Sequence, residues 1–193
     1  MTRKRIIAGI VAIAGGFIFV IIVLALHILQ PNYDPVHQHM SELAIGPYGL
    51  LMLIAFSSFA TAVFSVQVGL RPLGAPLMFR ILLMAAAFCL LGAGIVKLDA
   101  APFLHVGFIA AVFVLLVVAM YLLPRTILWF HTSAARFASW GLAAVTTLSV
   151  SLGGRIPAGI AQRIAASCIL LWLFWTGWHI IIANEIGDDS GSK

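Results

Sequence analysis

The chain has 193 residues, of which 63% are hydrophobic and 9% charged, and its mean hydropathy is +1.13. Soluble domains average roughly 45–50% apolar and about 25% charged residues. The composition therefore excludes an ordinary soluble domain and predicts a protein whose surface mostly faces lipid. The net charge of +5 comes from cations scattered between apolar segments, so nucleic acid is not expected as a partner.

Six apolar segments are long enough to be membrane-spanning helices, because a bilayer core of about 30 Å needs about 20 apolar residues in a helix. In the fifth segment only residues 137–152 suit lipid, because Gly153-Gly154-Arg155-Ile156-Pro157 interrupts the pattern. We predict an all-α fold, an integral membrane bundle of six transmembrane helices in a single membrane domain over residues 1–193. The predicted spans are residues 6–29, 50–70, 77–96, 104–123, 137–154 and 164–186.

The lysines and arginines are divided unequally between the two sides of the predicted bundle. Six spans place both termini on one side, and an excess of Lys and Arg marks the cytoplasmic side. We therefore predict a multi-pass protein of the cell (inner, or cytoplasmic) membrane with both termini in the cytoplasm. The terminal side holds Arg3, Lys4, Arg5, Arg71, Arg80, Arg125, Arg136 and Lys193, whereas the outer side holds Lys97, Arg155 and Arg163.

The first outer loop, residues 30–49, predicts a short helix of about ten residues. Asp34 followed by Pro35 is typical of a helix start, because the carboxylate accepts from free N–H groups and proline suits the first helical position. Gly46-Pro47 is a matching stop. Since such a helix is too short to span a membrane, we expect it to lie at the outer interface.

On that helix His37 and Ser41 are four residues apart and would share a face, with Glu42 beside them. An imidazole near a hydroxyl and a carboxylate suits general base catalysis, so these three are candidate catalytic residues. The alternative is an interfacial helix that Asp34 caps and whose polar residues face water. The residues alone leave both interpretations open.

The second outer loop contributes Asp99 and His105. His105 enters the fourth span among apolar neighbours, and an ionisable group there usually faces the bundle interior or a wet cavity. A zinc-type site would need three or four converging ligands, and their spacing here matches no known metal signature, so no cofactor is identified. The residues that such a site would use are Asp34, His37, His39, Asp99 and His105.

The third outer loop carries Arg155 and Arg163, two cations that oppose the orientation bias. One interpretation is that they neutralise the outer acids Asp34, Glu42 and Asp99; the other is that they hold an anionic head group. We favour the internal pairing, because three outer cations match three outer acids in number.

Several segments resemble the bacterial and archaeal membrane family DUF998, a domain of unknown function. They are Asn32-Tyr33-Asp34-Pro35-Val36, Met40-Ser41-Glu42-Leu43, Gly46-Pro47-Tyr48-Gly49, Gly159-Ile160-Ala161-Gln162-Arg163-Ile164 and Leu171-Trp172-Leu173. The resemblance implies a compact six-helix integral membrane protein and no particular activity. It also implies a Pro-x-Asp-Pro segment and two histidines near the fourth span, where this chain has Leu98-Asp99-Ala100 and only His105. A site that used both histidines would be lost here.

The sequence thus predicts a membrane protein with an outward-facing polar pocket that binds a lipid or an anionic ligand. The alternative is a membrane-embedded, metal-assisted hydrolase or transferase that acts on a lipid; whether the protein is an enzyme stays open. Membrane lipids are the expected partners, and no protein partner is identified. The candidate ligand-binding residues are Asp34, Asp99, His105, Arg155 and Arg163.

Overall fold

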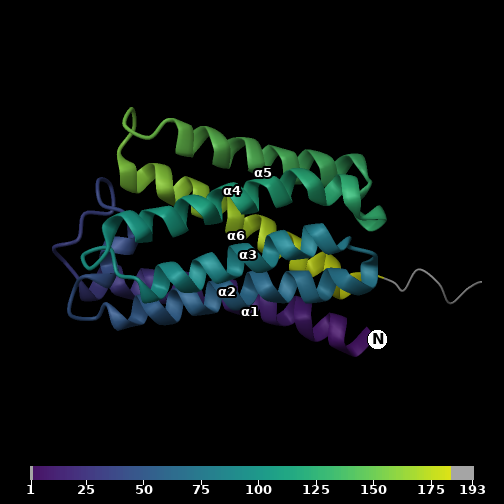
Figure 1. Ribbon diagram of the computed structural model, residues 1–193, viewed down its shortest axis with the longest axis horizontal. Helices are drawn as coiled ribbons and strands as arrows, with labels where there is room; N and C mark the ends of the chain where they lie inside the picture. The colour runs from purple at the N-terminus through teal and green to yellow at the C-terminus, as the bar shows by residue number, and fades with distance from the viewer. Residues whose placement is uncertain (1, 184–193) are drawn as a thin grey trace, which may run out of the picture.

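The structure is a computed structural model that describes residues 2–183, and its regular elements are helices (Figure 1). Five of the six long helices are long and apolar enough to cross a membrane, and α5 is not among them. Residues 184–186 of the predicted sixth span and Lys193 lie outside the described residues. The long helices are α1 (Thr2–Leu29), α2 (Leu50–Leu70), α3 (Leu77–Ile95), α4 (Pro102–Thr126), α5 (Ser133–Ser151) and α6 (Ala158–Ile182).

Each predicted segment corresponds to one long helix, and the largest differences are in α5 and α6. The predicted fifth segment runs past Ser151, where α5 ends; Gly154 follows in the left-handed region with φ 87°. The predicted sixth segment starts well after Ala158, because the first turns of α6 contain Gln162 and Arg163. An apolar criterion leaves such polar turns out of a span.

All three loops predicted to be outer gather at one end of the bundle, which we call the loop end (Figure 1). They are residues 30–49, 96–101 and 152–157. The N-terminus and the connections around residues 71–76 and 127–132 lie at the opposite, terminal end. The helices therefore alternate in direction along the chain.

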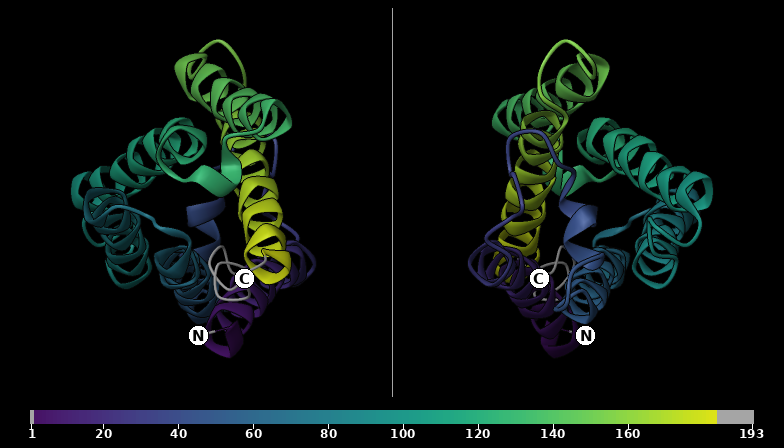
Figure 2. Two further views of the ribbon diagram at one scale, coloured as in Figure 1. Left: turned by 90° about the vertical axis from the view of Figure 1, so that its right-hand side faces the viewer. Right: turned by 90° about the vertical axis from the view of Figure 1, so that its left-hand side faces the viewer.

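Viewed end-on, consecutive helices pack side by side from α1 to α6, and α6 returns to pack against α1 (Figure 2). A short 3-10 helix, η1 (Met40–Ala44), enters the space between α2 and α6 at the loop end. It buries Met40, Leu43 and Ala44 in the hydrophobic core. The first loop thus fills the core between helices that would otherwise leave a gap.

α5 is attached to its neighbours by a buried serine. Ser139 Oγ donates to the carbonyl oxygen of Met120 on α4 at 2.6 Å and accepts from Trp172 Nε1 on α6 at 2.9 Å. The hydroxyls of Thr146 and Thr147 donate to carbonyl oxygens one turn earlier in α5. These side chains lower the hydropathy of α5, yet their polar atoms are satisfied inside the protein.

Candidate functional site

The first loop does not form the predicted ten-residue helix. Asp34 Oδ1 accepts from the backbone N–H of Val36 at 2.8 Å, and this local bond favours a turn over a continuing helix. His39 is extended (φ −67°, ψ 147°), and only Met40–Ala44 form the 3-10 helix η1. The predicted helix is therefore wrong in length, because the Asp34 turn and the extended His39 interrupt it.

This interruption separates the three predicted catalytic residues. The His37 side chain is 71% exposed and lies 2.7 Å from Asp34 Oδ2 through Nδ1, whereas Ser41 is buried at 4% exposure. Glu42 accepts from the backbone N–H of His39 at 2.8 Å and from Gln38 Nε2 at 3.0 Å. His37 and Glu42 thus stabilise the fold of the loop, and neither bonds to the Ser41 hydroxyl.

Asp34 is exposed at the surface of this loop. The hydrogen bond from His37 is the main reason that the pKa of Asp34 lies below its usual value, and the Val36 N–H lowers it further. These contacts favour the ionised carboxylate. Asp34 therefore forms a turn in place of the helix cap that the sequence predicts, and His37 is its partner.

Arg163 on α6 makes four hydrogen bonds, all of them to uncharged groups. Nη1 donates to the carbonyl oxygens of Gly159 at 3.0 Å and Gln38 at 3.3 Å. Nη2 donates to Tyr33 Oη at 2.6 Å and to His27 Nε2 at 3.0 Å. The expected pairing with an outer acid is wrong: within residues 2–183 the ion pairs comprise His37 with Asp34 alone.

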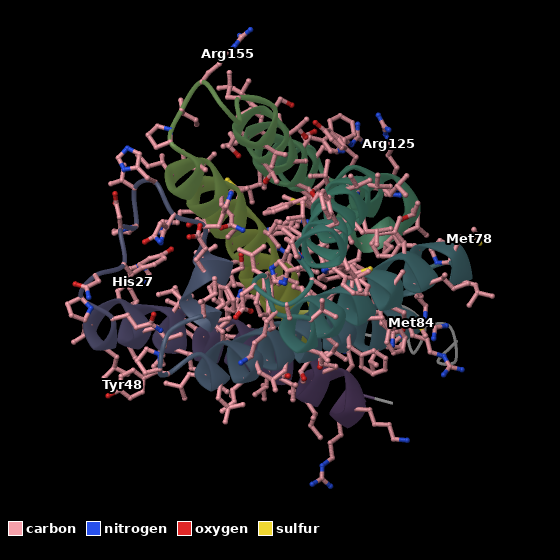
Figure 3. All side chains as sticks on the ribbon, turned by 60° about the vertical axis from the view of Figure 1, so that its left-hand side comes forward. His27, Tyr48, Met78, Met84, Arg125 and Arg155 are labelled. Carbon is pink, nitrogen blue, oxygen red and sulfur yellow. The ribbon has the colours of Figure 1, made fainter. Side chains whose placement is uncertain are left out.

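His27 and Tyr33 each present an acceptor atom to Arg163. His27, near the end of α1 (Figure 3), has Nδ1 2.6 Å from the carbonyl oxygen of Val23; since a carbonyl only accepts, Nδ1 carries the proton and Nε2 accepts from Arg163. The Tyr33 ring lies 5.5 Å from Arg163 Cζ. Burial raises the pKa of Tyr33, and the hydrogen bond from Arg163 partly opposes that rise.

The start of α6 also touches the backbone of the first loop directly. Gly159 lies so close that a Cβ there would meet the carbonyl oxygens of Pro35, of Gln38 at 2.6 Å and of Val36 at 2.7 Å. The Ile160 N–H donates to the Val36 carbonyl at 3.2 Å. We call Gly159, Arg163, Tyr33, His27 and the loop backbone that they contact the loop latch.

A further hydrogen bond joins α6 to the first residue of η1. Gln162 Oε1 accepts from the backbone N–H of Met40 at 2.7 Å. Residues 32–43 and 159–164, which contain segments that resemble DUF998, are thus far apart in the sequence but packed together in the fold. Their joint occurrence has a structural reason, because each satisfies the polar backbone of the other.

Arg155 and Asp99 belong to neither the loop latch nor its surroundings. Arg155 is exposed at the tip of the loop 152–157, and its side chain extends away from the helices (Figure 3). Asp99 is exposed, and the hydrogen bonds within the described part of the chain include none to its side chain. The five predicted ligand-binding residues therefore lie at one end of the bundle but do not form a single cluster.

A cavity of about 200 Å³ lies on the opposite flank of η1, between α4, the end of α5 and the start of α6. Its walls are mostly apolar, and its polar lining residues carry no permanent charge: His39, Ser41, His105 and Gln162. Ser41 and Gln162 also line a second cavity of about 40 Å³, which is otherwise walled by apolar core residues. The apolar lining residues of the larger cavity are Leu98, Val106, Ile109, Phe113, Val150, Gly153, Ala158 and Ala161.

His105, in the first turn of α4, is the most buried polar residue of that lining, at 1% exposure. Its Nδ1 lies 2.6 Å from the carbonyl oxygen of Val96, at the end of α3. Its other ring nitrogen, Nε2, is buried and has no hydrogen-bond partner. An unsatisfied buried polar atom costs about 1–3 kcal/mol, so this nitrogen is a candidate ligand contact.

The five residues weighed as zinc ligands are not brought together. Among the residues that the structure describes, no group of three or more His, Cys, Asp or Glu side chains converges for a metal ion. His37 is at the surface with Asp34, whereas His105 is in the core and bonds to the backbone. The zinc-type interpretation therefore has no geometric support in this part of the chain.

Gln162, Tyr33 and the apolar residues of the cavity walls are not among the site residues predicted from the sequence. Gln162 and Tyr33 stand within the motifs that resemble DUF998, so those motifs contained the signal. Ile109 and Phe113 gave none, because apolar residues occupy nearly every position of the fourth span. Only the fold distinguishes a residue that faces a cavity from one that faces lipid.

A comparison with family profiles finds one match over most of the chain. The profile described as a protein of unknown function, DUF998, matches residues 13–179, a range that includes the loop latch and the cavity. No curated protein and no solved structure matches the chain.

Proposed function

The chain belongs to the DUF998 family, whose function is unknown, and we propose that it is an integral membrane protein that binds a lipid in the cavity between α4, α5 and α6. The cavity itself carries this proposal. It has a volume of about 200 Å³, and its apolar walls with a few polar groups are the usual make-up of a ligand site. Even an engineered apolar cavity of about 150 Å³ binds small apolar molecules.

We propose that all six long helices span the membrane. Five are apolar enough by composition, and α5 has 19 residues, which corresponds to about 28 Å of helix. The hydroxyls of Ser139, Thr146, Thr147 and Ser149, in the middle and last turns of α5, bond to protein carbonyls, so they do not require water. α5 also lies alongside α4 and α6 (Figure 1), which favours a parallel position in the bilayer.

We propose that the protein resides in the inner (cytoplasmic) membrane. The loop end then faces outward, and both termini lie in the cytoplasm. The described terminal end carries seven of the eight cations assigned to that side, and the loop end carries Lys97, Arg155 and Arg163. This imbalance supports the orientation. The cavity then opens near the outer interface, where a lipid tail reaches it from the outer leaflet.

The hydrolase or transferase alternative has no comparable support. Its proposed base, His37, is engaged with Asp34, and its carboxylate, Glu42, is engaged with the loop backbone and Gln38. The candidate hydroxyl, Ser41, lines the cavity and is better placed to contact a ligand there.

The test is lipid binding to a chain whose cavity has been filled. Purified protein is delipidated and titrated with decanol and with decyl methyl ether, and the bound fraction is followed by native mass spectrometry. Ala161 lines the cavity and is buried, so Ala161→Phe should abolish binding of both compounds. The matched control is Ala144→Phe on the exposed face of α5, which should bind like wild type.

Equal binding by wild type and Ala161→Phe would contradict the proposed site. If Ala161→Phe proves unstable, Val106→Trp on the opposite wall tests the same point, because Val106 lines the cavity from an exposed position of α4.

A further inference from the structure

His105 is held so that only one ring nitrogen remains for another partner. The Nδ1–H donates to the Val96 carbonyl oxygen at 2.6 Å, and in the neutral ring this leaves Nε2 as a hydrogen-bond acceptor. That nitrogen is buried and unpartnered, and the Phe56 ring packs near the imidazole at 6.3 Å between ring centroids. A buried acceptor in such apolar surroundings calls for a hydrogen-bond donor.

The charges at the loop end restrict what that donor belongs to. Among residues 2–183, no Lys, Arg, Asp or Glu lines the cavity. Arg163 is turned to the other flank of η1, where Tyr33 and His27 occupy it, and Arg155 extends away from the helices. A charged head group in the cavity would therefore lose its water without gaining a countercharge, which is strongly unfavourable.

Resting on the proposed lipid site, we propose that the ligand is an uncharged lipid alcohol whose hydroxyl donates a hydrogen bond to His105 Nε2. Its hydrocarbon chain lies against the apolar walls contributed by α4 and α6. Ser41 and Gln162 lie at the junction of the two cavities and offer further polar contacts to the hydroxyl end. This assignment replaces the anionic ligand that the outer arginines suggest in the sequence.

The test compares three ligands with the same chain on the delipidated full-length protein by native mass spectrometry. Decanol carries the donor, decyl methyl ether lacks it, and decyl phosphate adds charge. Because one net hydrogen bond is worth about a factor of ten or somewhat less in affinity, we expect decanol to bind roughly threefold to tenfold tighter than the ether. Decyl phosphate should bind more weakly than both.

The substitution His105→Phe should remove the preference for decanol while both compounds still bind. The matched control is His131→Phe, because His131 is exposed in the connection 127–132 at the terminal end and does not line the cavity; it should keep the preference. The ligand comparison on wild type stands even if His105→Phe does not fold.

Equal affinity of wild type for decanol and the ether, with both lost in Ala161→Phe, would overturn the role of His105 and leave the lipid site standing. Tighter binding of decyl phosphate would overturn the uncharged ligand. Binding that Ala161→Phe does not affect would overturn the proposed site as well.

Discussion

The two flanks of η1 use polar side chains in opposite ways. On the flank that faces α1, Arg163, Tyr33 and His27 are joined to one another and to the loop backbone. On the flank that faces α4, His105 lines an apolar cavity and its Nε2 is buried without a hydrogen-bond partner. The comparison indicates that the charged residue holds the loop, whereas the uncharged polar residues remain available for a ligand.

The largest expected effect is the loss of the Arg163 side chain. Arg163→Met removes four hydrogen bonds from a charged donor, and such bonds contribute about 1.5–3 kcal/mol each without being additive. We expect the free energy of unfolding to fall by about 3 kcal/mol, which would be measured as a lower Tm in detergent. Arg155→Met, at the exposed loop tip, should change stability by less than about 0.5 kcal/mol. Equal Tm values for the two variants would show that Arg163 does not hold the first loop, contrary to the contrast drawn between the two flanks of η1.

A methyl group at Gly159 should separate the loop from α6. A Cβ there meets three backbone carbonyl oxygens, which cannot rotate away as side chains do, and such overpacking costs about 1–3 kcal/mol. Gly159→Ala should therefore lower the Tm measurably. The control is Gly141→Ala on α5, where a Cβ meets nothing within 4 Å and helix propensity favours alanine. An unchanged Tm in Gly159→Ala would show that the first loop does not pack tightly against Gly159.

Tyr33→Phe tests a single hydroxyl of the loop latch. That hydroxyl accepts from Arg163 at 2.6 Å and donates to the Gln38 carbonyl oxygen at 3.2 Å, and the substitution keeps the aromatic ring beneath the guanidinium. We expect a loss of about 1.5 kcal/mol, smaller than for Arg163→Met, in the same thermal unfolding assay. Tyr48→Phe, on an exposed tyrosine of the same loop, should be neutral. An unchanged Tm in Tyr33→Phe would show that the Tyr33 hydroxyl does not contribute to the stability of the loop latch.

The smallest effect is the acid sensitivity of Asp34. Its pKa in the folded protein lies below the usual 3.8, so its contribution to stability is present above that value and is lost as the pH falls through the folded pKa. Wild type should melt slightly higher than Asp34→Asn near neutral pH. This difference should vanish well below pH 3.8. A gap that persists or widens in acid would contradict the His37 contact.

The sequence predicted the helices well because lipid imposes a strong length and composition requirement. Leu50–Leu70 has the same bounds in both, whereas α6 begins earlier, since Gln162 and Arg163 bond to the first loop and do not face lipid. The site was harder to predict. Periodicity placed His37 and Ser41 on one helical face, but the Asp34 turn and the extended His39 ended that helix.

Charge counting was also misleading for the site. Three cations and three acids at the loop end suggested internal pairs, but Arg163 takes carbonyl, phenol and imidazole acceptors that the sequence does not mark. Backbone carbonyls become available only where the chain turns, and their positions depend on the tertiary fold. His105 was recognised from its apolar neighbours, but its free nitrogen follows from the Val96 contact.

The most direct test of the proposed lipid site is to map where a photoreactive decanol attaches to the protein. A diazirine on the hydrocarbon chain is activated in the purified full-length protein, and labelled peptides are identified by mass spectrometry. We expect labels on α4 between His105 and Phe113 and on α6 between Ala158 and Gln162, with both lost in Ala161→Phe. Labels confined to outward-facing residues such as Phe103 and Phe137, unchanged by Ala161→Phe, would contradict it.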